Sequence, residues 1–259
     1  MAVIKKHPPG TFCWTDLGSK NVAGAAKFYQ RIFGWTSRDQ PMGGSGFVYS
    51  TMLVKGRDAC AVYPMDDEQR KRKAPPCWLP YLCVRSAART ARKAKAAGGR
   101  ICLGPLKVME HGRLAIMQDP TGATFGLWQP AKHRGAGLNN TPGTVCWHDL
   151  NTLQPGVAAK FYAKVFGWKT QAMGKGAGVY RLFKLGRSGV GGVWPVPLPK
   201  LPPSWLTYWN VRDCSRTVAQ VRRLGGRVMM APMTVPGYCR FAVLRDPQGA
   251  AFGVLQPLV

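Results

Sequence analysis

Residues 10–35 read GTFCWTDLGSKNVAGAAKFYQRIFGW, and residues 143–168 read GTVCWHDLNTLQPGVAAKFYAKVFGW. The two stretches align without a gap, and 14 of their 26 positions are identical. Further on, DPTGATFGLWQP at 119–130 matches DPQGAAFGVLQP at 246–257, and PCWLPY at 76–81 matches PSWLTY at 203–208. Three matches in the same order indicate two copies of one domain. We predict a first domain at residues 1–130, a linker at 131–142 and a second domain at 143–259.

Each copy follows the same order of predicted elements. A short strand (11–17 or 144–150) precedes a helix whose apolar residues, such as Ala25, Phe28 and Tyr29, recur at helical spacing. Gly34 and Gly167 are suited to end that helix. A hairpin follows, then a strand (78–84 or 205–211), a second helix (86–97 or 214–224) and three short strands, the last two flanking an Asp-Pro-x-Gly turn. We therefore predict an α+β fold with two strand–helix–strand–strand–strand units in each copy.

This order of elements, the AAKFYxxxFGW helix and the DPxGxxFGLWQP ending resemble the vicinal oxygen chelate superfamily. That superfamily includes glyoxalase I, extradiol dioxygenases and bleomycin-resistance proteins. The resemblance covers nearly the whole chain and is nearest to the tandem glyoxalase/bleomycin-resistance-like proteins. It implies two tandem glyoxalase-like domains, each made of paired βαβββ modules that curl a mixed sheet into a half-open cup.

The resemblance also implies where a divalent metal would be held, by His, Gln or Glu at one position on each of four cup strands. Transferred by register, the four positions are occupied in the two copies by Trp14 and Trp147, Ala61 and Gly192, Leu79 and Leu206, and Gly126 and Gly253. None of these side chains can coordinate a divalent ion. A shift of one residue would restore one or two ligands in a site that needs three or four. We therefore expect neither cup to bind a metal, and we predict no cofactor.

Asp16, His148 and Asp149 are the candidate catalytic residues. The two aspartates share the strand face of Trp14 and Trp147, so they could serve as acid–base groups in the cups; the alternative is a turn or helix cap. His148 could act as a general base, but side chains alternate along a strand, so His148 and Trp147 cannot both face the cup. Asp119 and Asp246 belong to the Asp-Pro-x-Gly turns, and we interpret them as turn formers.

Aromatic residues on the predicted strands suggest a pocket for a planar organic ligand. The candidate ligand-binding aromatics are Trp14, Tyr49 and Tyr81 in the first copy and Trp147, Tyr180 and Tyr208 in the second. Arg113 and Arg240 occupy matching positions before the Asp-Pro turn and could hold an anionic group. The alternatives are that many of the aromatics belong to the core and that the arginines lie on the surface.

The chain is strongly basic, with 37 Lys and Arg against 11 Asp and Glu and a formal net charge of +26. Residues 1–137 hold 22 basic and 8 acidic side chains, and residues 138–259 hold 15 and 3, so no single tail carries the excess. The densest points are RKRK at 70–73 and RSAARTARKAKAAGGR at 85–100. Non-specific nucleic-acid binding is possible, but we favour a solvated basic surface because no recognition motif accompanies the charge.

The composition of the chain excludes several classes of protein. A hydrophobic content of 46% excludes a disordered polycation, and no apolar run reaches the length of a membrane span. The first residues lack the apolar region of a secretory signal, and the eight cysteines form no CxxC pair, which favours a reduced, cytoplasmic protein.

The leading hypothesis from the sequence is a metal-free small-molecule binding protein that sequesters an aromatic or anionic compound. The alternatives are a lyase, isomerase or dioxygenase-like enzyme with displaced metal ligands, and a nucleic-acid-binding protein. We expect a monomer whose copies form an internal pseudo-dimer, or a homodimer, without membrane association.

Overall fold

The computed structural model of the chain describes residues 3–42, 47–175, 179–194 and 201–258. The strands and helices of the first copy are β1 (Phe12–Ser19), α1 (Val22–Phe33), β2 (Thr36–Met42), β3 (Phe47–Val54), β4 (Arg57–Pro64), α2 (Asp67–Lys71), β5 (Cys77–Cys83), α3 (Ala87–Ala96), β6 (Arg100–Val108), β7 (Gly112–Gln118) and β8 (Thr124–Pro130). Those of the second copy are β9 (Val145–Asn151), α4 (Pro155–Phe166), β10 (Lys169–Ala172), β11 (Arg181–Leu185), β12 (Ser188–Val193), β13 (Ser204–Asn210), α5 (Cys214–Arg223), β14 (Arg227–Val235), β15 (Cys239–Arg245) and β16 (Ala251–Pro257). No helix among these residues is long and apolar enough to span a membrane.

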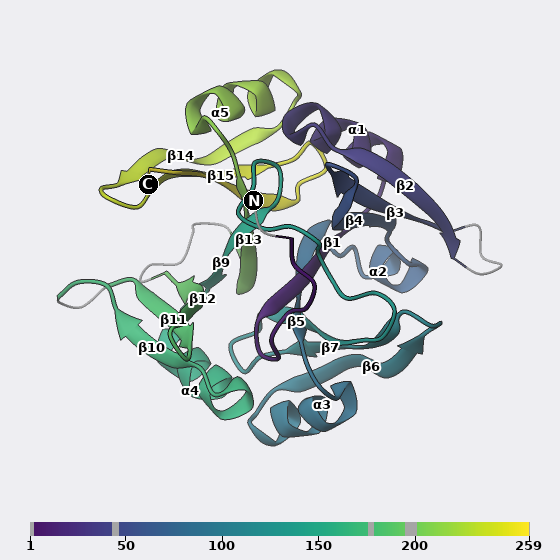
Figure 1. Cartoon of the computed structure of the whole chain (residues 1–259), viewed down its shortest axis with the longest axis vertical. Helices are drawn as coiled ribbons and strands as arrows, with labels where there is room; N and C mark the ends of the chain where they lie inside the picture. The colour runs from purple at the N-terminus through teal and green to yellow at the C-terminus, as the bar shows by residue number, and fades with distance from the viewer. Residues whose placement is uncertain (1–2, 43–46, 176–178, 195–200, 259) are drawn as a thin grey trace.

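Each copy forms one mixed sheet of eight strands. The strand orders are β2-β3-β4-β1-β5-β8-β7-β6 and β10-β11-β12-β9-β13-β16-β15-β14, so the two sheets have the same topology. The central strands β1 and β5 pair antiparallel, while β1 with β4 and β5 with β8 pair parallel. Figure 1 shows α1 and α5 at one end of the molecule and α3 and α4 at the opposite end. The predicted α+β fold, with the same order of elements in both copies, is confirmed.

Glycine ends the first helix of each copy, as predicted. Gly34 after α1 and Gly167 after α4 have φ of 69° and 75°, in the left-handed region where a residue without a side chain is favoured. The second helices also lie where the sequence placed them, because Ser86 and Asp213 cap their first turns through side-chain oxygens.

The basic segment at 70–73 begins inside the short helix α2, whose last two residues are Arg70 and Lys71. Asp66 and Gln69 bond reciprocally at the start of this helix, forming a capping box that nucleates a single turn. The charges of this segment therefore project from an exposed helical turn.

The helix-covered faces of the two sheets meet, and each of the two main cores contains residues of both copies. Helix α1 packs with α5 and the strands β15 and β16, and α4 packs with α3 and the strands β7 and β8. The core therefore lies between the copies, while the opposite, concave face of each sheet forms a cup with a smaller apolar cluster of its own. We call these cup 1, in the first copy, and cup 2, in the second.

Two hydrogen-bonded triads join the copies across this core. In the first, Trp78 donates to the Tyr29 hydroxyl at 2.9 Å, and Tyr29 donates to Asp246 of the other copy at 3.0 Å. In the second, Trp205 donates to the Tyr162 hydroxyl at 2.7 Å, and Tyr162 donates to Asp119 at 2.9 Å. We call these the interdomain triads.

The interdomain triads unite the three repeated motifs. The tryptophan comes from PxWLxY, the tyrosine from AAKFY and the aspartate from DPxG. Asp119 also forms its turn as predicted, since its other oxygen accepts from the amides of Thr121 and Ala123. The same aspartates thus shape a turn and bind the opposite copy.

Candidate functional site

The family's metal-ligand positions lie on the concave faces of the sheets. In cup 1, Asp16 of β1 lies directly beside Ala61 of β4 and Leu79 of β5, and Tyr81 lies beside Gly126 of β8. The same registers recur in cup 2 with the residues Asp149, Gly192, Leu206, Tyr208 and Gly253. The central row of each cup therefore contains one carboxylate and small or apolar neighbours.

Asp16 is buried at the floor of cup 1. The Tyr49 hydroxyl donates to its Oδ2 at 3.3 Å, and the Trp14 indole donates to that same hydroxyl at 2.9 Å. Its Oδ1 is buried and has no hydrogen-bond partner in the described part of the chain. Burial raises the pKa of Asp16 to about 7, and hydrogen bonds from Tyr49 and Tyr81 only partly oppose this. A large fraction of this carboxyl is therefore protonated near neutral pH.

Asp149 is the corresponding group in cup 2, and it has more donors. Its Oδ1 accepts from the Tyr180 hydroxyl at 2.6 Å and from the Trp147 indole at 3.0 Å. Burial raises the pKa of Asp149 to about 6, while Tyr180, Trp147, Tyr208 and Trp194 lower it. The Tyr208 hydroxyl and the Trp194 indole nitrogen are nevertheless buried without a well-formed hydrogen bond to a described residue. Cup 2 thus has two unsatisfied donors close to a carboxylate.

The cups do not fit the divalent metal that the family implies. A Cβ atom at Gly126 would lie 2.0 Å from the Tyr81 ring, one at Gly253 would lie 2.1 Å from the Tyr208 ring, and one at Gly192 would collide with the Tyr180 hydroxyl. Tyrosine side chains therefore occupy the space into which ligands at these positions would extend. Within the described residues, no three His, Cys, Asp or Glu side chains are grouped as a metal site requires.

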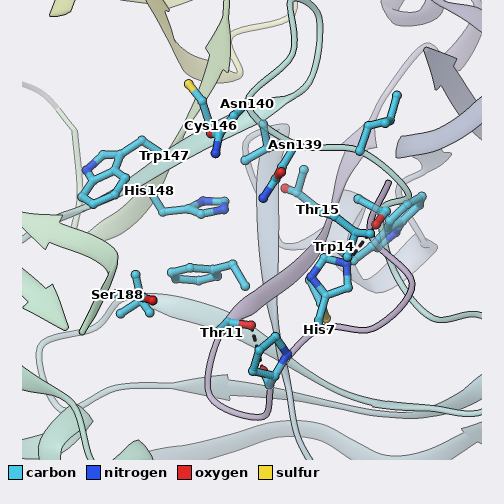
Figure 2. Close-up of a pocket in the computed structure, with 18 of the residues that line it drawn as sticks. His7, Thr11, Trp14, Thr15, Asn139, Asn140, Cys146, Trp147, His148 and Ser188 are labelled. Atoms are coloured by element: carbon cyan, nitrogen blue, oxygen red, sulfur yellow. Dashed lines mark hydrogen bonds between the residues drawn. The ribbon is translucent and has the colours of Figure 1, made fainter. Parts of the chain in front are cut away.

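His148 lies on the face opposite cup 2, where strand alternation placed it. Its Nδ1 is 3.2 Å from the Thr207 hydroxyl, and its ring lies 4.0 Å from that of Phe12 in the first copy. Burial lowers the pKa of His148 to about 3, so the imidazole is neutral at physiological pH. Figure 2 shows it among the residues that line a cavity between the copies. The structure therefore separates it from the two candidate catalytic aspartates.

Arg113 and Arg240 lie outside the concave faces of the cups. Along β7, Leu114 packs in cup 1, whereas Ala115 packs in the interdomain core, and Arg113 shares the alternation of Ala115. Along β15, Arg240 likewise alternates with the cup residue Phe241. Both arginines lie on the helix-covered side of their sheets, because the strand phase excludes them from the concave side.

The predicted aromatics all lie at the cup clusters. Trp14, Tyr49 and Tyr81 belong to cup 1, and the hydrogen bonds to Asp149 place Trp147 and Tyr180 beside Tyr208 in cup 2. Sequence reasoning missed Phe241, whose ring lies 5.5 Å from that of Trp194. The alternation of Cys239, Phe241 and Val243 along β15 could have identified it.

His133 was also missed. This linker residue packs its ring edge-on against Trp14 at 4.5 Å and against Trp128 at 5.6 Å. Its backbone carbonyl accepts from the Trp128 indole at 2.9 Å, which fixes the linker against cup 1. A segment without helical or strand periodicity gives no signal for such a contact.

A cup of paired βαβββ modules defines the vicinal oxygen chelate class, and the comparisons agree with it. A model of the "Glyoxalase/Bleomycin resistance protein/Dioxygenase superfamily" matches residues 149–254. The chain is 39% identical over 253 residues to "Putative glyoxylase CFP32" of Mycobacterium tuberculosis, with 97% of each chain covered. It is 31% identical over 264 residues to "Anthracycline biosynthesis protein DauV" of Streptomyces sp. (strain C5), covering 98% of this chain and 95% of that one.

Among solved structures, the Mn(II)-bound glyoxalase from Novosphingobium aromaticivorans has a similar fold, with a TM-score of 0.66. It is 14% identical in sequence, over 97% of this chain and 83% of that chain. The protein therefore belongs to the glyoxalase/bleomycin resistance/dioxygenase superfamily, as its repeated motifs predicted.

Proposed function

We propose that the protein is a metal-independent binding protein for a planar aromatic compound, which it holds in its cups. The observation that carries this proposal is a set of buried polar atoms at the cup floors without a well-formed hydrogen bond to a described residue: Asp16 Oδ1 in cup 1, and the Tyr208 hydroxyl and Trp194 Nε1 in cup 2. Buried polar atoms without partners are rare in proteins, and ligand oxygens would satisfy them. The neighbouring aromatic rings offer faces for a planar ligand.

Exposed apolar side chains near the second cup support the same proposal. Met229 and Met230 of β14 are partly buried against cup 2, and Met233 on the same strand is half exposed. Methionine adapts its shape to different ligands and makes favourable contacts with aromatic rings. The relative DauV is named as an anthracycline biosynthesis protein, and anthracyclines contain fused planar rings. A multi-ring aromatic compound is therefore the ligand class that we favour.

Titration with 1,8-dihydroxyanthraquinone, a planar probe with oxygens at its edge, tests this proposal through tryptophan fluorescence. We expect saturable quenching in the wild type. The affinity for the probe should be about tenfold lower in Phe241→Ala, because about 1.4 kcal/mol of binding free energy from ring contact would be lost. The matched control is Arg113→Gln, on the opposite sheet face, which should bind like the wild type. Absence of saturable quenching, or equal affinity in Phe241→Ala and the wild type, would contradict the proposal.

Metal independence has its own test. We expect elemental analysis of the purified protein to find no stoichiometric divalent ion, and a chelator to leave probe binding unchanged. One tightly held ion per cup would overturn this part of the proposal while leaving aromatic binding open to the titration above.

An acid–base enzyme is the second candidate, of the lyase, isomerase or dioxygenase-like type. The pKa of Asp16 at about 7 and that of Asp149 at about 6 suit groups that exchange protons near neutral pH. Each carboxyl lies beside a tyrosine hydroxyl that could orient a substrate oxygen. Loss of turnover of an aromatic substrate in Asp16→Asn or Asp149→Asn would favour this candidate. Turnover that survives both changes would exclude the two aspartates as catalytic residues.

We propose a cytoplasmic monomer in which the copies act as a pseudo-dimer; a homodimer is the alternative. The triads and shared cores that pair the copies within one chain support the monomer. Nucleic-acid binding remains the less favoured role, with basic side chains of α3 such as Arg89 and Arg92 as its phosphate contacts. A gel shift at low salt that shows no complex with DNA or RNA would dispose of it.

A further inference from the structure

A cavity of about 410 Å³ lies between the two copies, and the cup residues Trp14 and Trp147 form part of its wall. Its walls come from the N-terminal segment, β1, the linker, β9 and β12, and Figure 2 shows the labelled lining residues around it. The volume falls within the range of pockets that hold small organic ligands.

The charge of the lining is one-sided. Among the described residues that line the cavity, none is acidic, and Lys6 supplies a fixed positive charge. Burial lowers the pKa of His7 and brings that of His148 to about 3, so neither histidine is charged at neutral pH. Lys6 makes no ion pair with a described residue. The electrostatics of the cavity therefore favour a ligand with one negative charge.

The cavity also offers aromatic surface and free polar groups. Phe12 and His148 lie with ring centroids 4.0 Å apart, and both line it. The side chains of Asn139, Asn140 and Ser188 line it as well and make no hydrogen bond to a described residue. Such groups can select the hydroxyl or carbonyl substituents of a bound ring.

We propose that this interdomain cavity is a second binding site, which takes a small aromatic anion such as a carboxylate or sulfonate. Lys6 pairs with the anionic group, Phe12 and His148 contact the ring, and the asparagine amides bind its oxygens. This site would exist whether or not the cups bind ligand.

The site also borders the hydrogen-bond clusters of both cups. Trp14 and Trp147 line the cavity, while their indole nitrogens donate to the Tyr49 and Tyr180 hydroxyls at 2.9 and 2.8 Å. A ligand in the cavity therefore lies one side chain away from each cup floor. It should alter tryptophan fluorescence directly.

The test compares two dyes of nearly the same shape, anionic 1-anilinonaphthalene-8-sulfonate and neutral N-phenyl-1-naphthylamine. We expect the sulfonate to bind this site with one molecule per chain and at least tenfold more tightly than the neutral dye. In Lys6→Glu the affinity for the sulfonate should fall about tenfold. Lys5→Glu, which makes the same charge change on an exposed neighbour outside the lining, should bind like the wild type.

A blocking variant separates this site from the cups. Ser188→Phe places a ring at the cavity wall and should weaken sulfonate binding, whereas the cup variant Phe241→Ala should leave it unchanged. Equal losses in Lys6→Glu and Lys5→Glu would show that only the overall charge attracts the dye and would overturn the proposal. Binding that is lost in Phe241→Ala but kept in Ser188→Phe would place the dye in a cup and would overturn it as well.

Discussion

Cup 1 and cup 2 contain the same central pair, an aspartate and a tyrosine hydroxyl, with different hydrogen bonds around it. In cup 1 the Tyr49 hydroxyl lies 3.3 Å from Asp16 Oδ2, and the Trp14 indole donates to the Tyr49 hydroxyl. In cup 2 the Tyr180 hydroxyl lies 2.6 Å from Asp149 Oδ1, and the Trp147 indole donates to both of these oxygens. Two further polar groups, on Tyr208 and Trp194, lower the pKa of Asp149.

The difference shows how donors set the charge of a buried carboxyl when burial is nearly equal. Two tyrosines oppose the burial of Asp16, whose pKa is about 7, and four donors oppose that of Asp149, whose pKa is about 6. Near neutral pH, cup 2 therefore carries its negative charge more fully than cup 1. Two cups from one repeat can thus present different charges to the same ligand.

The largest expected effect is on the pH dependence of stability. Both aspartates have a higher pKa in the folded state than in the unfolded state. Their contribution to the free energy of unfolding is therefore fully present below about pH 4, and it is lost as the pH rises through about 7 for Asp16 and about 6 for Asp149. At pH 8, Asp16→Asn should raise the free energy of unfolding by about 4 kcal/mol and Asp149→Asn by about 3 kcal/mol. Urea unfolding at pH 4 and pH 8 measures both.

The gain should vanish at pH 4, where the wild-type carboxyls are already neutral. Some slope will remain in each variant, because burial also raises the pKa of Asp119 and Asp246. A gain of equal size at pH 4 and pH 8 would show that charge burial is not its cause. A larger gain for Asp149→Asn would reverse the order of the cups.

The interdomain triads, unlike the cups, have the same residues and the same hydrogen-bond pattern in both copies. Tyr162→Phe leaves the buried Trp205 indole and one Asp119 oxygen without a partner, and Tyr29→Phe does the same to the other triad. Each change should lower the free energy of unfolding by about 2 kcal/mol, and the two effects should match. Thermal or urea unfolding measures them, with exposed Tyr238→Phe as the control. Unequal losses would mean that the copies differ in the core as well as in the cups.

The smallest expected effect concerns the linker residue at cup 1. His133→Ala removes the ring contacts with Trp14 and Trp128 and should lower stability by about 1 kcal/mol. It should change tryptophan emission while leaving anthraquinone binding at cup 2 intact. His111→Ala, in the turn between β6 and β7, serves as the control, because the His111 ring stacks on no aromatic ring of the described residues. No change in emission would show that the linker does not shape cup 1.

Much of the fold could be predicted because the signals are local. Helix ends at Gly34 and Gly167 and strand alternation around Trp14 depend on neighbouring residues alone. The same alternation separated His148 from Asp149. Applied along the outer strands, it also places Arg113 and Arg240 outside the cups.

The parts that sequence reasoning missed depend on contacts between distant segments. The hydroxyl of Tyr29 finds its acceptor on Asp246, 217 positions away, so the motif alone does not reveal that bond. The contact of His133 with Trp14 and the interdomain cavity likewise arise where the linker folds back on β1. No periodic pattern encodes such a return of the chain.

The crossed arrangement of the interdomain triads makes the two halves dependent on each other. Each triad takes Trp and Tyr from one copy and Asp from the other, so a half expressed alone would expose an apolar face and leave a buried-type tyrosine without its acceptor. A substitution at a triad residue of one half therefore disturbs the packing and hydrogen bonds of the other half. A single copy would therefore need a partner with an equivalent surface in order to fold stably.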